Sequence, residues 1–302
     1  MLGRFSLGLL FCFLICAQAP AQDAAYQDHL ASNTRKLVTN LRPLLRPTLQ
    51  AFEASILDDI DFRIVPDLIY QGLARRIGGK RVVIIYSGIP FMMEVLSNSM
   101  FVGLQGKREC YERHLKSSLE TFVYNSDPNH QANKRPVFHP AAYANFELSC
   151  AGAEQIFANM DARQRQVVAD FIQTSIAAVI LHEIAHHVLG HVDNPPGPGM
   201  SPAALERSRQ DEDAADRWAI RKLLEMKMSL LPTIPYLLMT AALTDYTLEA
   251  ERASTHPLGA RRALGLLDNI AVEVNKIDPD SPVVGQVKDF RKVLNNITSP
   301  QN

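Results

Sequence analysis

The chain has 302 residues, enough for one large domain or two small ones, and its 47% of apolar residues supplies a substantial hydrophobic core. Its 31 basic and 32 acidic side chains leave a formal charge of −1, a balance that gives no reason to expect a nucleic-acid partner.

Residues 1–21 have the pattern of a secretory signal peptide. Arg4 is their single charge, residues 5–17 are an apolar run, and small residues at positions 19–21 fit a cleavage site. The run is short for a membrane span, and the alternative is an uncleaved anchor. We therefore expect an exported protein, periplasmic or secreted, in which residues 22–302 form a single domain that does not span the membrane.

Two cysteines, Cys110 and Cys150, remain after removal of the signal. In an exported protein such a pair favours a disulfide, which would stabilise the fold by about 3–4 kcal/mol. The alternative is two buried free thiols. A zinc role is not indicated, because the chain has no CxxC spacing.

The first half of the domain begins with helices. Residues 22–60 repeat leucine at three- and four-residue steps, a helical pattern that Pro43 and Pro47 should break or kink. The β-branched residues 81–87 predict a strand, and further strands are expected within 91–104 and 119–124.

The second half is predicted to be mainly helical. Asp161 and Gln164 resemble a capping box at the start of a long helix, and Gly190 is a natural stop. Its stretch 175–181 is apolar on nearly all sides, which suggests a helix passing through the core. Ser201 and Pro202 should start the next helix, which runs to about Met226.

The C-terminal part carries three weaker signals. Residues 230–243 are apolar and interrupted by proline, which favours a buried or surface-docking helix and leaves membrane contact open. Another helix is expected to start within 254–257 and run through Leu266. Residues 281–295 predict a closing amphipathic helix.

The most informative stretch is residues 181–191, LHEIAHHVLGH. Four residues make slightly more than one helical turn, so His182 and His186 project from one face and can share a divalent metal. Glu183 follows the first histidine, close to the metal but off the ligand line, where a carboxylate can take the proton of an activated water. This is the HExxH arrangement of zinc hydrolases.

A catalytic zinc ion needs a third protein ligand, for which the chain offers three candidates. His187 lies about 140° round the helix from His182 and should face away. His191 would lie on the opposite side unless the helix turns at Gly190. Glu212 on the next helix is the best candidate, with Asp216 one turn later placed to accept a hydrogen bond from a ligand histidine.

Residues 255–262 offer one more candidate element. His256 could stabilise negative charge on an attacked carbonyl oxygen, with Arg262 farther along the same helix. The alternative is a histidine at a helix start with a surface arginine.

At these residues the chain resembles the gluzincin metallopeptidases of the CAAX prenyl protease and HtpX-like family. The shared motifs are HExxH at 182–186 with His191, ExxAD at 212–216, and Thr255-His256-Pro257 with Arg262. They cover about a third of the chain, with a motif core at about 161–267. The tetratricopeptide repeats and spanning helices of some family members are not recognised here.

The resemblance implies an endopeptidase with one zinc ion per chain, bound by His182, His186 and Glu212. Glu183 would be the general base, Asp216 would orient a ligand, and His256 and Arg262 would line the site. The expected fold is an α+β, helix-rich zincin-type domain with a small sheet and an HExxH active-site helix. An edge strand from 91–104 would hold the substrate.

The expected substrate is a protein or peptide. One cellular role that this activity would suit is envelope protein quality control. A zinc-binding, chaperone-like or latent factor with the same fold and little turnover is the alternative. A zinc hydrolase acting on a bond other than a peptide bond is a third reading.

Overall fold

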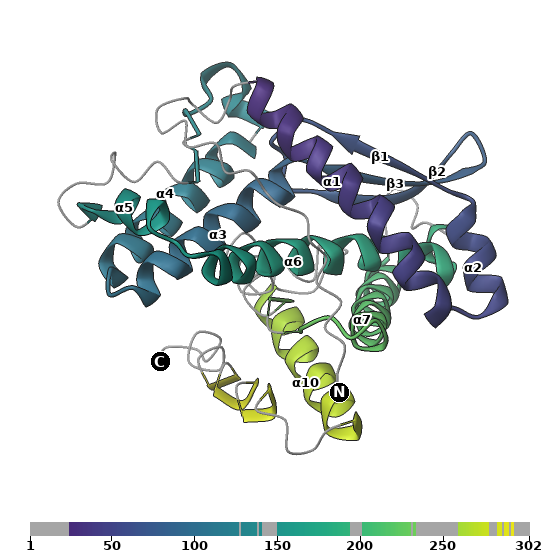
Figure 1. Cartoon of the computed structure of the whole chain (residues 1–302). Helices are drawn as coiled ribbons and strands as arrows, with labels where there is room; N and C mark the ends of the chain where they lie inside the picture. The colour runs from purple at the N-terminus through teal and green to yellow at the C-terminus, as the bar shows by residue number, and fades with distance from the viewer. Residues whose placement is uncertain are drawn as a thin grey trace.

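Helices make up most of the protein in the computed structural model (Figure 1). The structure describes residues 24–126, 128–137, 139–140, 150–193, 201–230, 232–233, 259–277, 283–285, 287–289 and 291–292. The predicted signal peptide at 1–21 and His256 lie outside these residues, as does most of the apolar stretch 230–243. The predicted closing helix at 281–295 is described only in three short helical pieces. The expected α+β class, helix-rich with a small sheet, is confirmed.

The N-terminal region is helical, as predicted. Helix α1 (Ala24–Leu45) is followed by the short 3-10 helix η1 (Arg46–Thr48) and by α2 (Ala51–Asp58). Pro43 falls in the last turn of α1 and Pro47 lies within η1, so the chain breaks where proline removes a backbone donor. All leucines of α1 except Leu44 are buried, which packs the helix against the core.

The sheet has three strands in the order β1-β3-β2. Strand β3 (Lys80–Tyr86) is the one predicted at 81–87, and it occupies the centre. It pairs in parallel with β1 (Ile60–Val65) and antiparallel with β2 (Gly72–Ile77). Gly78 and Gly79, with φ of +57° and +81°, make the tight turn between β2 and β3. Within this sheet β2 is an edge strand.

The strands predicted within 91–104 and 119–124 are wrong. These residues lie in α3 (Gly88–Leu104) and α4 (Arg108–Ser126). Nearly every residue of α3 from Gly88 to Ser99 is buried, so its sequence shows no amphipathic helical period. Phe91 stacks on Phe122 of α4 with ring centroids 5.2 Å apart. After α4 comes the 3-10 helix η2 (Pro128–Asn133).

The predicted disulfide is present between Cys110 of α4 and Cys150. Both residues are buried beside Val102 and Ala153, the latter at the start of α5 (Ala153–Ala158). The bond therefore joins α4 to the segment that leads into the second half of the chain.

Helix α6 (Ala162–Val188) is the centre of the fold. The capping box between Asp161 and Gln164 is formed, and residues 175–181 are buried on all sides. Among the described helices α6 alone is long and apolar enough to cross a membrane, but 83% of its most apolar window is buried inside the protein. It is therefore a core helix.

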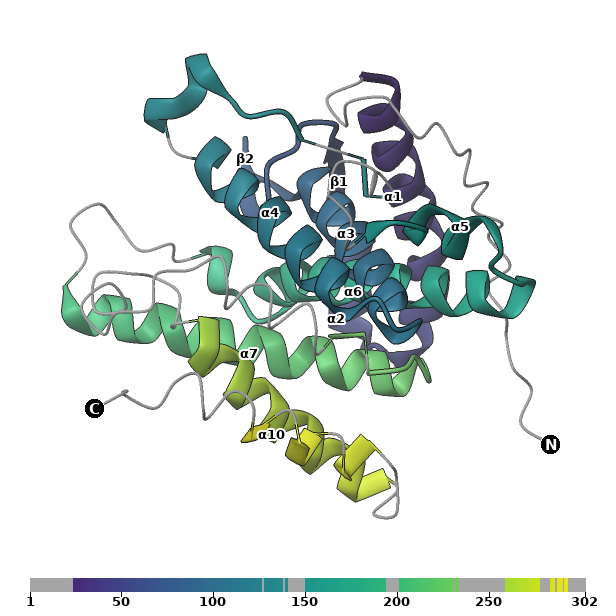
Figure 2. The same cartoon turned by 90° about the vertical axis from the view of Figure 1, so that its left-hand side faces the viewer.

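Helices α7 (Pro202–Glu225) and α10 (Gly259–Ile277) lie on the side of α6 away from the sheet (Figures 1 and 2). After the short 3-10 helix η5 (His191–Asp193), α7 begins as predicted, with Ser201 as its cap. Helix α10 packs on α7 and extends beyond the predicted end at Leu266. These contacts bring three helices together at the C-terminal half of α6.

Candidate metal centre

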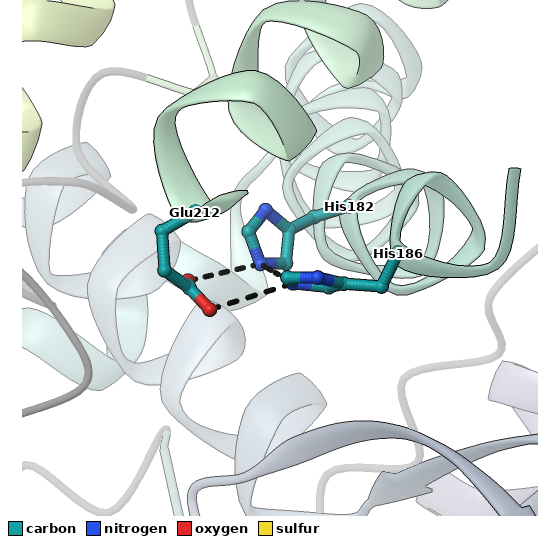
Figure 3. Close-up of side chains that lie close together, drawn as sticks. All are labelled: His182, His186 and Glu212. Carbon is teal, nitrogen blue, oxygen red and sulfur yellow. Dashed lines mark hydrogen bonds and ion pairs between the residues drawn. The ribbon is translucent and has the colours of Figure 1, made fainter. Parts of the chain in front are cut away.

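Three side chains predicted as metal ligands converge between α6 and α7 (Figure 3). His182 and His186 project from one face of α6, and their Nε2 atoms lie 3.0 Å apart. Glu212 of α7 places Oε2 at 3.3 Å from Nε2 of His182 and Oε1 at 3.5 Å from Nε2 of His186. One ligand atom from each residue lies within 4.8 Å of the others.

The donor set of this centre fits a metal ion. Two imidazole nitrogens and one carboxylate are the protein ligands of a family of catalytic zinc sites, which leave a fourth position for water or substrate. His182 and Glu212 are each only 6% exposed, so their polar atoms are withdrawn from solvent and meet one another. The geometry therefore supports metal binding at this centre.

Asp216 contacts the His182 ring at the nitrogen that does not face the other candidate ligands. Its Oδ1 lies 2.7 Å from Nδ1 of His182, on the side of the ring away from the other ligands. A carboxylate in this place fixes the tautomer of a ligand histidine and raises its basicity. The carboxylate of Asp216 therefore lies directly beside the ring of a candidate ligand.

Arg262 of α10 completes this side of the centre. Its Nε and Nη2 donate to the two carboxylate oxygens of Asp216 at 2.6 and 2.8 Å, and its Nη1 lies 3.4 Å from Oε2 of Glu212. A two-point contact of this kind holds both groups in a fixed orientation. Arg262 therefore connects α10 to the candidate site.

The charged groups around His182 shift its pKa in opposite directions. Burial and the Arg262 guanidinium lower the pKa of His182, but Asp216 and Glu212 outweigh them and raise it to about 10. Burial and His182 lower the pKa of His186 to about 3. The pKa of Asp216 falls well below its ordinary value, because Arg262 and His182 outweigh its burial. The surrounding carboxylates therefore favour the protonated form of His182, whereas burial and the neighbouring His182 favour the neutral form of His186.

The other two histidines of the stretch lie outside the ligand group. His187 faces away from the centre, as predicted, and its Nε2 donates to the backbone oxygen of Val82 at 3.1 Å. His191 lies behind His186, with their Nδ1 atoms 3.0 Å apart. Glu212 rather than His191 therefore supplies the third candidate ligand.

Glu183 is buried on α6 and lies against the start of the edge strand β2. A Cβ added at Gly72 would come within 2.7 Å of Oε1 of Glu183, so the absence of a side chain there makes room for the carboxylate. Sequence reasoning missed Gly72. The only available signal was a glycine within a strand-like stretch, which often marks a close approach of backbone to another group.

Comparison with known families identifies a match in the region that holds the centre. A family model described as Peptidase U49 matches residues 86–277, which is more than half of the chain and extends from the end of β3 to the end of α10. Searches of curated proteins and of solved structures give no match.

Proposed function

The chain belongs to the peptidase U49 family, and from that premise we propose that it is a zinc-dependent endopeptidase with one zinc ion per chain. The observation that carries the proposal is the convergence of His182 and His186 with Glu212 on one point between two helices. Family membership supports a peptidase acting on proteins or peptides. Zinc dependence and the residue roles below are the proposal, as is the finer resemblance to the CAAX prenyl protease and HtpX-like gluzincins with a zincin-type fold.

The proposed roles at the centre are of two kinds, binding the metal ion and transferring protons during hydrolysis. A zinc ion held by the three ligands would act as a Lewis acid that polarises the scissile carbonyl and activates water. Glu183 would accept the proton of the attacking water and deliver it to the leaving amine. Its carboxylate is adjacent in sequence to His182 and buried against Gly72, which restricts where it can point.

Two basic groups are proposed to act on charge at the site. Arg262 is anchored on Asp216 and on the ligand Glu212, so its guanidinium holds these two carboxylates in place and adds positive charge beside them. His256 is proposed from its motif to donate to the attacked carbonyl oxygen.

The edge strand for substrate is proposed to be β2, because the predicted strand in 91–104 is a helix. Strand β2 pairs with β3 on one side, and its first residue lies against Glu183. An extended peptide that added to β2 by main-chain hydrogen bonds would pass beside the general base. This placement supports hydrolysis within a chain, hence an endopeptidase.

Export to the periplasm or outside the cell is also part of the proposal. The Cys110–Cys150 disulfide supports it, because disulfides persist in oxidising compartments. A role in envelope protein quality control is proposed from the resemblance alone.

The deciding experiment measures metal content and proteolysis on the same samples. Purified protein would be analysed by metal mass spectrometry and incubated with casein, beside Glu183→Gln and the exposed control Glu206→Gln. We expect about one zinc per chain in all three proteins and loss of cleavage only in Glu183→Gln.

Two results would decide against the proposal. If the purified protein binds no transition metal even when supplied with it, the assignment as a metallopeptidase is refuted. Zinc bound without cleavage under any condition would favour the chaperone-like or latent factor, and a peptide library would separate a peptidase from another zinc hydrolase.

A further inference from the structure

We propose that His191, with Asp211 beside it, is a positioning residue that holds the ring of His186 in its metal-binding tautomer and orientation. The inference rests on the proposed metal site and adds a support for the second histidine ligand. His182 has such a support in Asp216, whereas His186 has no carboxylate behind it among the contacts described above.

The two rings meet in a sheltered contact. Nδ1 of His186 lies 3.0 Å from Nδ1 of His191, and the ring planes cross at 69°. Both side chains are 13% exposed, so water competes weakly for the nitrogen atoms between them. The Nε2 atom of His186 meanwhile points to His182 and Glu212.

The proton positions follow from these partners. A ligand nitrogen must present its lone pair, so His186 coordinating through Nε2 carries its proton on Nδ1. Two nitrogens 3.0 Å apart share one proton, so Nδ1 of His191 is the acceptor. The remaining proton of a neutral His191 then lies on Nε2, which faces Oδ1 of Asp211 at 3.5 Å.

The course of the backbone brings His191 and Asp211 next to His186. Helix α6 ends after Val188, and Gly190, with a φ of +78°, allows the chain to turn back so that His191 faces the helix it has just left. The following turn is held on β2 by the ion pair between Arg76 and Asp193, at 2.6 Å. Asp211 directly precedes the ligand Glu212 on α7.

The two supports differ in strength. His182 contacts a buried carboxylate directly at 2.7 Å, whereas His186 reaches a half-exposed carboxylate only through a second imidazole. We therefore expect that loss of His191 weakens metal binding without abolishing it, since His182 and Glu212 remain fully supported.

The test measures metal affinity rather than proteolysis. Zinc affinity would be determined by chelator competition, and the ligand field would be followed by the absorption spectrum of the cobalt-substituted protein. His191→Phe removes the acceptor and keeps a ring, and we expect zinc affinity to fall by about 10–100-fold with an altered cobalt spectrum. His191→Gln, whose oxygen can accept from His186, should recover part of the loss.

Two further variants keep the result interpretable. His29→Phe on the exposed face of α1 is the matched control and should retain wild-type affinity. Asp211→Asn changes one atom of a side chain that is 47% exposed, so it should fold even if His191→Phe does not, and it should weaken affinity in the same direction by less.

The possible failures are distinguishable. If the wild type binds no metal, the proposed function fails. If the wild type binds zinc and both His191→Phe and Asp211→Asn bind it equally well with an unchanged cobalt spectrum, only the positioning role is refuted.

Discussion

Oδ1 of Asp216 lies 2.7 Å from Nδ1 of His182, and the same carboxylate receives two hydrogen bonds from Arg262. One acidic side chain thus links a candidate ligand on α6 to an arginine on α10. The whole link is buried, with Asp216 only 6% exposed. Neutralising this carboxylate should therefore affect both the metal site and the packing of α10.

We predict that Asp216→Asn lowers zinc affinity by about 10–100-fold, because an amide orients the His182 ring without raising its basicity. It should also destabilise the protein by about 3–5 kcal/mol, since the buried Arg262 loses its main counter-charge. Chelator competition and urea unfolding measure the two effects. Asp213→Asn, on the exposed side of α7 beside Arg217, is the control and should change neither quantity appreciably. Wild-type affinity in a folded Asp216→Asn protein would contradict the role.

Gly72 provides a prediction specific to the reacting group. In Gly72→Ala the new Cβ would stand 2.7 Å from Oε1 and 3.2 Å from Cδ of Glu183, so the carboxylate has to move. We expect a reduced kcat for peptide hydrolysis with unchanged zinc content, because the three atoms nearest to the added methyl group all belong to Glu183 and none to a candidate ligand. Gly265→Ala is the matched control, since its Cβ would meet only Asp213 at 3.9 Å. Equal kcat values in the two variants would show that the position of Glu183 tolerates the shift.

The parts of this fold that sequence predicts are those specified by local chemistry. Asp161 and Ser201 begin helices because their side chains accept from backbone groups three residues later, a signal contained within four residues. The helical repeat similarly places His182 and His186 on one face. Glu212 required one further step, the assumption that the next helix returns beside the first.

The parts that sequence did not predict depend on distant contacts. Residues 88–99 of helix α3 are buried on all sides, so neither helical nor strand periodicity distinguishes them, and the apolar residues of the helix suggested strands. The pairing of β2 with β3 and the approach of Gly72 to Glu183 depend on how the sheet packs against α6. The contact between His191 and His186 likewise depends on the turn at Gly190.

Glu94 predicts a pH dependence of stability far from the metal site. It is buried on α3 and accepts a hydrogen bond from the Tyr26 hydroxyl of α1 at 2.6 Å. Burial raises the pKa of Glu94 from 4.5 to about 7, with the Tyr26 hydrogen bond opposing the shift. Because the folded state holds this proton more tightly, its contribution to stability is complete below about pH 4.5 and is lost as the pH rises to about 7.

The loss corresponds to about 3 kcal/mol, and Glu94→Gln should remove it because the amide does not ionise. Urea unfolding at pH 5 and pH 8 would measure the difference. We expect the wild type to lose about 2.5 kcal/mol more than Glu94→Gln between these values, because Glu94 of the unfolded chain is already largely ionised at pH 5. The exposed Glu109→Gln variant on α4 should follow the wild type. Identical pH dependence in all three proteins would show that Glu94 titrates near its ordinary value.

The Cys110–Cys150 disulfide gives a prediction about stability that leaves the metal site untouched. The two cysteines are 40 residues apart, and a cross-link closing a loop of this length stabilises a fold by about 4 kcal/mol by restricting the unfolded chain. Reduction should lower the free energy of unfolding by that amount, as measured by urea unfolding with and without dithiothreitol. The Cys110→Ala/Cys150→Ala protein should be less stable than the oxidised wild type and insensitive to reductant.

Zinc affinity should be unchanged wherever the protein is folded, because α6 and α7 supply the three candidate ligands and neither contains these cysteines. An unfolding midpoint that does not respond to reductant would mean that the purified protein does not hold the bond.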